Sequence, residues 1–319
     1  MNTTVIGCGR WGSFLAWYLD RIGHRVTLYG RPDSPHMDTF IKTRTNGSVT
    51  LPPSIALCSD LGVATLPADI IVVSIGSQGL RGLMAEIRNL SPENKDFVLC
   101  MKGLEMGTGK RLSEIARESL PASCPVSVWL GPGHVQEFVS GIPNCMVIDS
   151  LDEAAKERLI QAFRGDLIRF YYGQDLLGNE IGAAAKNVIG IAAGMLDGLD
   201  RTNLKGALMS RGTRELARLI AAMGGNEQSA YGLCHLGDYQ ATVFSSFSHN
   251  RRYGEALIRG ESFDKLAEGC YTVKALLSLG ERYGVDLPIS DAVDAIIYRN
   301  AAPMEALDEL FTRSLKKEF

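Results

Sequence analysis

Near its amino terminus the chain reads Thr3-Thr4-Val5-Ile6-Gly7-Cys8-Gly9-Arg10-Trp11-Gly12. A short β-branched segment precedes three glycines with the spacing G-x-G-x-x-G, and a helical pattern follows over residues 11–22. In a strand–turn–helix of this kind the first glycine allows the tight turn. The second lets the backbone approach a pyrophosphate, and the third allows close helix–strand packing. In this context dinucleotide binding is favoured over glycines that serve only a turn.

Strand-like and helix-like segments alternate through the first half of the chain. The strands that we predict are 3–6, 25–29, 70–75, 97–100, 126–130, 145–148 and 167–171. Strands separated by helices predict a parallel, doubly wound sheet of the Rossmann type, so the fold class is α/β. From about Asp175 a helical period takes over, with predicted helices at 181–196, 206–223, 271–283 and 290–300. We therefore expect a dinucleotide-binding domain over residues 1–174 and an all-α substrate domain over residues 175–319.

Composition excludes several classes of function. The chain has 319 residues, 45% of them hydrophobic and 22% charged, with a formal net charge of −3. This balance predicts neither a nucleic-acid partner nor a membrane surface. The seven cysteines are widely spaced and contain no C-x-x-C pair, which disfavours a disulfide framework or a metal site and favours the reducing cytoplasm. No secretory signal or membrane-spanning run is visible.

The end of the predicted second strand bears on cofactor choice. NAD-selective sites usually place an acidic residue about 20 residues past the glycines, where it holds the ribose hydroxyls. Arg31 stands nearest that position here, and Asp33 follows two residues later. An arginine can pair with a 2′-phosphate, which favours NADP or the use of both cofactors. A solvated loop arginine is the alternative.

Two lysines are candidates for the reacting centre. Lys186 lies in a predicted helix among small apolar residues, where partial desolvation disfavours the ammonium and suits a general acid or base. A lysine that reaches solvent from one exposed stripe is the alternative. Lys102 follows the strand at 97–100, and ligands of open α/β sheets bind beyond the carboxyl ends of the strands. Lys102 can therefore meet an anionic substrate, or it can be a surface lysine before a turn.

A polar segment follows later in the chain. It includes Ser248, His249, Asn250, Arg251 and Arg252. Together these side chains can bind a phosphate group, although polar loops are commonly only solvated.

With these residues assembled, the chain resembles the bacterial NAD(P)-dependent glycerol-3-phosphate dehydrogenases over nearly its whole length. The most specific block is Ala185-Lys186-Asn187-Val188-Ile189-Gly190-Ile191-Ala192-Ala193-Gly194. Other matching blocks are Lys102-Gly103-Leu104-Glu105, Gly131-Pro132, Ser210-Arg211-Gly212, Leu236-Gly237-Asp238, residues 248–254 and Glu268-Gly269. The glycine motif alone is shared by many families.

The resemblance implies that the protein interconverts sn-glycerol 3-phosphate and dihydroxyacetone phosphate with NAD or NADP, as a homodimer. It implies that Lys186 exchanges the proton at the C2 oxygen, with Lys102 and Asp238 as further catalytic residues. The implied substrate-binding residues are Lys102, Gly131, Gly133, Lys186, Asp238, Thr242, Ser248, His249 and Asn250. The implied cofactor-binding residues are Gly7, Gly9, Arg10, Trp11, Gly12, Arg31, Ser77, Lys102, Val135, His249, Leu266 and Glu268.

Two positions depart from the family pattern. The family usually has Ser-Arg-Asn where this chain has Ser248-His249-Asn250, and imidazole cannot make the bidentate bond of a guanidinium. The family's Gly-Pro-Ser-Phe-Ala corresponds to Gly131-Pro132-Gly133-His134-Val135, which lacks the serine hydroxyl. These changes leave open another phosphorylated or anionic hydroxy compound as substrate, or a weaker, pH-sensitive form of the parent activity with His134 and His249 near each other. A non-catalytic nucleotide-binding regulator is a third hypothesis, against which the retained lysines argue.

Overall fold

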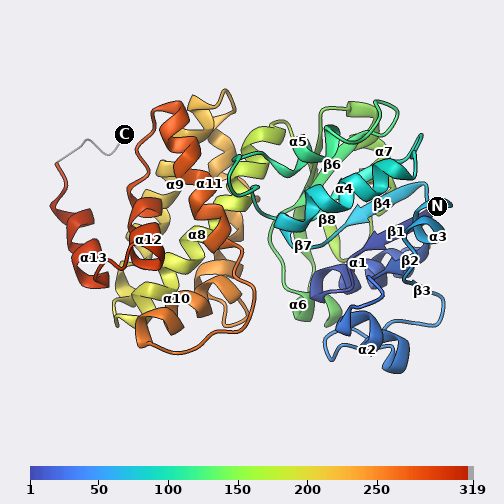
Figure 1. Ribbon diagram of the computed structural model, residues 1–319, viewed down its shortest axis with the longest axis horizontal. Helices are drawn as coiled ribbons and strands as arrows, with labels where there is room; N and C mark the ends of the chain where they lie inside the picture. The colour runs from blue at the N-terminus through green and yellow to red at the C-terminus, as the bar shows by residue number, and fades with distance from the viewer. Residues whose placement is uncertain (315–319) are drawn as a thin grey trace. The chain divides into compact units, whose positions relative to one another are not determined.

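The computed structural model describes residues 1–314, and the chain divides into two compact units (Figure 1). The first unit comprises Met1–Lys102 and Lys110–Glu180. The second comprises Gly103–Gly109 and the chain from Ile181 onward. All strands of the described chain belong to the first unit, and the second is helical.

One eight-stranded sheet organises the first unit, with the strand order β3-β2-β1-β4-β5-β6-β7-β8. The strands are β1 (Asn2–Ile6), β2 (Arg25–Tyr29), β3 (Ala56–Cys58), β4 (Ile70–Val73), β5 (Asp96–Leu99), β6 (Val126–Leu130), β7 (Asn144–Ser150) and β8 (Ile168–Tyr172). The seven predicted strands are confirmed with small shifts at their ends. The prediction missed β3, which has only three residues and none of them buried.

The expectation of a wholly parallel sheet is wrong at one pair, because β7 runs antiparallel to β6. The connection between them contains only the short helix α6 (Val135–Val139). At about 1.5 Å per residue this helix covers less than half the length of a five-residue strand, which is about 16 Å. The chain therefore does not return to the starting edge of the sheet, and it enters β7 from the edge at which β6 ends.

Both faces of the sheet are covered. Val72 belongs to the apolar cluster that contains α1 residues, whereas Val73 is equally buried and points to the opposite face. Helices α1 and α7 pack on the first face, where the Tyr18 hydroxyl donates to the Phe163 carbonyl at 2.7 Å. The helices of this unit besides α6 are α1 (Arg10–Arg21), α2 (Pro35–Thr43), α3 (Leu61–Thr65), α4 (Leu80–Asn89), α5 (Leu112–Arg117) and α7 (Glu153–Phe163).

The second unit is built around α8 (Leu176–Gly198), in which every residue from 181 to 196 is buried. The other helices are α9 (Lys205–Ala222), α10 (His249–Arg259), α11 (Gly269–Tyr283), α12 (Pro288–Tyr298) and α13 (Pro303–Thr312). The four helices predicted from periodicity are confirmed to within a few residues, and α10 and α13 were not predicted. Within the described part of the chain no helix has both the length and the apolar character needed to cross a bilayer. All seven cysteines are free thiols.

Candidate functional site

The three glycines after β1 meet different surroundings. Gly7 has a φ of +112°, and a Cβ there would lie 2.1 Å from the Ser74 carbonyl oxygen. A Cβ at Gly12 would lie 1.9 Å from the carbonyl oxygen of Gly7, whereas one at Gly9 would meet nothing within 4 Å. The first and third glycines are therefore required by packing. The second leaves open space above the backbone, as a bound pyrophosphate requires.

The start of α1 completes this cradle. Gly9 caps the helix without a side-chain hydrogen bond, and the first turn holds no acidic residue. The first-turn N–H groups and the positive end of the helix dipole therefore lack a competing side-chain anion. This arrangement fits the pyrophosphate of a dinucleotide cofactor, and Gly7, Gly9, Arg10 and Gly12 stay its predicted contacts.

The other cofactor candidates of the first unit lie on α1 or after strands next to β1. Trp11 is partly buried, with its ring centroid 5.0 Å from that of Phe14. Arg31 follows β2 and is exposed, with a 3.6 Å ion pair to Asp33. Ser77 is buried at the start of the short helix η1 (Ser77–Gly79), after β4. Because β2, β1 and β4 are neighbours in the sheet, their following loops lie at one edge.

Lys102 is held at the same edge of the sheet. It follows β5, and its Nζ donates to the Gly131 carbonyl at 2.6 Å, directly after β6. Gly131 has a φ of +127°, a conformation that favours glycine. The structure thus brings together two of the predicted substrate residues of the first unit.

Gly133 has a backbone reason to be glycine. Its φ is +152°, and a Cβ there would lie 2.2 Å from Cε2 of Phe138, a buried ring on α6. The absence of a serine hydroxyl therefore accompanies a loop conformation that L side chains rarely adopt. Val135, the first residue of α6, is buried beside this loop.

Lys186 is the centre of a polar cluster in the second unit. It lies on α8 and is only 7% exposed. Its Nζ lies 2.7 Å from Oδ2 of Asp238 and donates to Oγ1 of Thr242, also at 2.7 Å. Thr242 in turn donates to the Asp238 carbonyl at 2.8 Å. A short 3₁₀ turn, η4 (Leu236–Asp238), and a π-helical turn, η5 (Gln240–Phe244), carry these two partners.

Two opposing effects act on the charge of the Lys186 amine. Burial disfavours the charged ammonium, whereas a carboxylate at 2.7 Å favours it, so the two effects oppose each other. The cluster therefore holds a dry ammonium with a defined hydrogen-bonding direction. A proton on this amine can pass to an oxygen that reaches hydrogen-bonding distance.

His235 and Tyr239 support this cluster and were missed by the sequence argument. Nδ1 of His235 lies 2.8 Å from the Gly182 carbonyl on α8, and its Nε2 lies 2.7 Å from the Tyr239 hydroxyl. A carbonyl oxygen only accepts, so Nδ1 carries the proton and Nε2 accepts from Tyr239. A Cβ at Gly182 would lie 3.0 Å from Cβ of His235, so glycine allows this approach. The pair thereby fixes the turn that ends at Asp238.

Acid is expected to weaken the second unit through His235. Burial lowers the pKa of this imidazole to about 4, from an ordinary 6.5. Between these values the unfolded chain binds a proton that the folded chain does not. The contribution of His235 to the free energy of unfolding therefore falls as pH falls from 6.5 to 4, by up to about 3 kcal/mol. Burial raises the pKa of Glu215 in the same unit to about 7, so the contribution of that carboxyl rises over much of this range, and the His235 contribution is the difference between wild type and His235→Gln. Urea unfolding at pH 7, 6, 5 and 4 measures the slope.

The His235→Gln variant should be less stable than wild type at pH 7, and this difference in the free energy of unfolding should shrink as pH falls from 6.5 to 4. His36→Gln is the control, because His36 is exposed on α2. A His235→Gln variant that keeps the wild-type slope would contradict the assignment of the acid sensitivity to His235.

Glycines bring α10 against α8. A Cβ at Gly194 would lie 1.8 Å from the Arg251 carbonyl oxygen, and one at Gly254 would lie 2.1 Å from the Ile191 carbonyl oxygen. The two backbones therefore touch, with no room for a side chain between them. This approach places Asn250 of α10 beside α8. Its partner there is Asn187, the residue that follows Lys186.

Asn250 joins three helices. Its Nδ2 donates to Oδ1 of Asn187 on α8 at 3.0 Å, and its Oδ1 accepts from the Gly269 N–H on α11 at 2.9 Å. The sequence indicated no role for Asn187, but its amide oxygen orients Asn250. The amide of Asn250 is therefore held in one orientation beside α8, at the start of α10.

The neighbours of Asn250 have different partners. Ser248 caps α10, accepting from the Arg251 N–H at 3.3 Å, and His249 is the first helical residue, with its ring centroid 6.3 Å from that of Phe263. Arg251 forms ion pairs with Asp197 and Glu255. The Arg252 guanidinium lies 5.7 Å from the centroid of the Phe263 ring. Arg251 is therefore bound to carboxylates on α8 and α10.

Asp197 is a second charged centre that the sequence argument did not single out. It lies one residue before the end of α8 and binds Nζ of Lys205 at 2.7 Å in addition to Arg251. Lys205 also donates to the Val243 carbonyl at 3.1 Å, next to Thr242. Hydrogen bonds from these cations keep the pKa of Asp197 below its ordinary value despite burial. The network ties η5 to the end of α8.

The remaining cofactor candidates lie before α11. Leu266 is 51% exposed in the segment that joins α10 to α11. Glu268 is the residue before α11, and its carbonyl accepts from the Thr272 hydroxyl at 3.0 Å. Their cofactor contacts stay predictions, as does the nearness of His134 to His249.

Comparison with known proteins finds one family that matches both halves of the chain. The description "NAD-dependent glycerol-3-phosphate dehydrogenase N-terminus" matches residues 2–156, and the description of the C-terminus of the same family matches residues 175–308. A glycerol-3-phosphate dehydrogenase [NAD(P)+] from Prosthecochloris aestuarii is 37% identical, with 100% of each chain covered. A protein of the same name from Chlorobium phaeobacteroides is 38% identical, covering 100% of this chain and 99% of that one.

Solved structures have the same fold. The crystal structure of glycerol-3-phosphate dehydrogenase from Coxiella burnetii superimposes with a TM-score of 0.91 and 27% identity, covering 98% of this chain and 99% of that one. The yeast enzyme is similar in fold, with a TM-score of 0.81 at 21% identity, covering 98% of this chain and 99% of that one. With both halves of the family matched in order and relatives above one-third identity, the chain belongs to the NAD-dependent glycerol-3-phosphate dehydrogenase family.

Proposed function

We propose that this protein interconverts sn-glycerol 3-phosphate and dihydroxyacetone phosphate with NAD or NADP, and that Lys186 is its general acid–base. The observation that carries the proposal is the buried Lys186 ammonium, held at 2.7 Å by both Asp238 and Thr242. Binding alone needs no proton-transfer group in such a place. The names of the curated relatives support the same activity.

The first unit supplies most of the cofactor contacts, and His249, Leu266 and Glu268 of the second unit are the others. The backbone at Gly9 and the first turn of α1 hold the pyrophosphate, and Arg31 and Ser77 follow neighbouring strands at the same edge. When bound, the nicotinamide supplies or accepts the hydride, which no amino-acid side chain can do. The exposed guanidinium of Arg31 is compatible with a 2′-phosphate as well as with a ribose.

The second unit supplies the proton. In the direction of reduction the ammonium of Lys186 gives a proton to the oxygen at C2, and in the direction of oxidation the neutral amine takes it back. Asp238 balances the charge and, with Thr242, directs the amine. Asn250, Ser248 and His249 are assigned to the phosphate group. Lys102 is assigned to the substrate from the first unit. We also propose that the protein acts in the cytoplasm as a homodimer, as the family resemblance implies.

The direct test follows NAD(P)H absorbance with dihydroxyacetone phosphate, and then with a panel of other small ketones. Oxidation of the reduced cofactor with dihydroxyacetone phosphate in preference to the panel is expected. A clear preference for another phosphorylated ketone would favour the second candidate, an altered substrate, to which Gly133 and His249 point. No turnover with any ketone, together with tight cofactor binding, would support a non-catalytic regulator.

Restoring the arginine of the family at position 249 is expected to strengthen binding of glycerol 3-phosphate. At pH 8 a guanidinium is fully charged, whereas an imidazole with an ordinary pKa, about 6.5, is almost entirely neutral. We expect His249→Arg to lower the KM for glycerol 3-phosphate by about five- to tenfold at pH 8, a typical gain from one charged hydrogen bond.

His36→Arg is the matched control for charge, because it adds the same group at an exposed position on α2. The KM of this control should stay at the wild-type value. Unchanged or weaker binding by His249→Arg would count against a role for residue 249 in holding the phosphate.

A further inference from the structure

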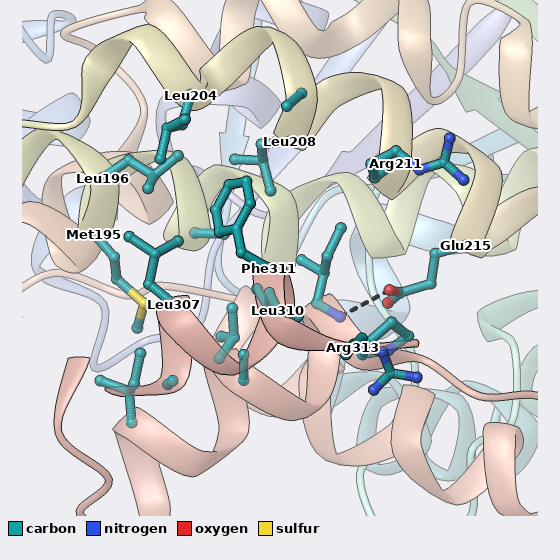
Figure 2. Close-up of a pocket in the computed structure, with 18 of the residues that line it drawn as sticks. Met195, Leu196, Leu204, Leu208, Arg211, Glu215, Leu307, Leu310, Phe311 and Arg313 are labelled. Carbon is teal, nitrogen blue, oxygen red and sulfur yellow. Dashed lines mark hydrogen bonds between the residues drawn. The ribbon is translucent and has the colours of Figure 1, made fainter. Parts of the chain in front are cut away.

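A cavity of about 470 Å³ lies in the second unit, lined by residues of α8, α9, α12 and α13 (Figure 2). None of the residues assigned above to cofactor, substrate or proton transfer lines it. Its size is within the range of small-molecule sites, about 300–1,000 Å³. The cavity is therefore a candidate site for a ligand other than the substrate.

One wall of the cavity is an apolar helix face that the protein leaves partly uncovered. Ala306, Leu307, Leu310 and Phe311 recur at helical spacing along α13, and all four line the cavity. Only Ala306 is buried, and Phe311 is 64% exposed. Figure 2 shows Phe311 pointing toward Leu208 of α9. An apolar ligand between α13 and α9 would remove this surface from water.

The charged side chains gather at one end of the cavity. In Figure 2, Arg211, Glu215 and Arg313 lie at the end opposite to Met195. Arg313 forms an ion pair with Asp286, another lining residue. The cavity is therefore amphipathic along its length, with an apolar end and a charged end.

The carboxylate of Glu215 is hydrogen-bonded to the start of α12. It accepts from the Ile289 N–H at 2.8 Å and from the Ser290 N–H at 3.1 Å, at the start of α12. It also accepts from the Ser290 hydroxyl at 2.8 Å. Glu215 thus caps α12 and makes no ion pair with Arg211, one turn earlier on α9.

Arg211 is left as the cation without a counter-charge. It is exposed, lines the cavity, and makes no hydrogen bond or ion pair with another residue among those that the structure describes. Arg218, by contrast, donates to the Asp286 carbonyl at 2.8 Å. A single planar guanidinium matches one carboxylate. A doubly charged group would meet stronger repulsion from Glu215 and Asp286.

We propose that this cavity binds a long-chain carboxylate, with the alkyl chain among the apolar side chains of α8, α9, α12 and α13 and the carboxylate on Arg211. The apolar length of the cavity selects an alkyl chain, and the unmatched guanidinium selects a negative head group. The inference is independent of the dehydrogenase activity, because it concerns residues that take no part in it.

Calorimetric titration of the full chain with hexanoate, octanoate and decanoate, each below its micelle concentration, tests the proposal. Affinity is expected to rise by about fourfold for each added methylene while the chain fits. Decanol, which has the same chain without the charge, should bind about five- to tenfold more weakly than decanoate. Absence of saturable decanoate binding, or an equal affinity for decanol, would overturn the proposal.

Two variants locate the site. Arg211→Gln should weaken decanoate binding by about five- to tenfold and leave decanol binding unchanged. Arg214→Gln is the control, because Arg214 lies on the same helix and does not line the cavity. Ala292→Phe places a ring in the cavity from α12 and should abolish binding of both ligands, with urea unfolding used to confirm that each variant is folded.

Other results decide against the proposal. Decanoate binding that survives Ala292→Phe in a folded protein places the ligand elsewhere. Equal losses of decanoate affinity in Arg211→Gln and Arg214→Gln would mean that the effect comes from the net charge of the protein and not from a contact with Arg211. A second copy of the chain is the other possible occupant. If Phe311→Glu converts a dimer to monomers and the wild type binds no decanoate, the apolar face is a subunit interface.

Discussion

Replacing Lys186 with alanine is expected to lower kcat for reduction of dihydroxyacetone phosphate by about 10²–10⁴-fold, the usual cost of losing one positioned general acid. The amine is buried and bound to Asp238 and Thr242. Lys186 is not among the residues assigned to the cofactor, so the affinity for NADH, measured by fluorescence titration, should stay at the wild-type value. Lys42→Ala, at an exposed position on α2, is the control.

Loss of folding must be separated from loss of chemistry in this experiment. Lys186→Ala leaves the Asp238 carboxylate buried without its cation, which typically costs about 3–5 kcal/mol of stability. The double variant Lys186→Met with Asp238→Asn removes both charges and should recover much of that loss in urea unfolding. Its kcat should stay low, because no acid has been restored. A folded double variant with wild-type turnover would refute the role of Lys186.

The sequence predicted most of the sheet because buried parallel strands carry their own signal. Ile70–Val73 is a run of β-branched residues, and such runs mark strands that are covered on both faces. The strand at Ala56–Cys58 has no such run, since it is short and only partly buried at the edge. The direction of β7 depends on how far the chain between β6 and β7 travels, and residue patterns within a strand do not report that.

The site was predictable only in part, for a related reason. Glycines and lysines in recognisable blocks indicated where chemistry takes place, and the small residues around Lys186 indicated a tightly packed helix. His235 is a single residue in a turn. Nothing in its sequence neighbours shows that the carbonyl of Gly182, 53 positions earlier, accepts a hydrogen bond from its ring. The same holds for Lys205, whose partners Asp197 and Val243 lie on either side of it in the chain. Contacts of this kind arise from how helices pack.

Helix packing also predicts the most damaging small substitution in the second unit, Gly194→Ala. The added Cβ would lie 1.8 Å from the Arg251 carbonyl oxygen and 2.9 Å from the Glu255 N–H nitrogen, both of them backbone atoms of α10. Backbone atoms cannot rotate aside as a side chain can, so α10 must move away from α8. We expect the free energy of unfolding to fall by about 3 kcal/mol, the upper end for overpacked cores.

The same displacement should reach the substrate. Asn250, one residue before Arg251, is bound to Asn187 on α8 and to Gly269 on α11. Moving α10 lengthens the bond to Asn187, so the KM for dihydroxyacetone phosphate should rise together with the loss of stability. Gly206→Ala is the matched control, since a Cβ at that position of α9 would meet nothing within 4 Å. Alanine has the higher helix propensity, by about 0.8–1 kcal/mol, so this control should be neutral or slightly stabilised. If Gly194→Ala is no less stable than Gly206→Ala, the two helices do not approach as closely as described, and the placement of Asn250 beside Lys186 loses its support.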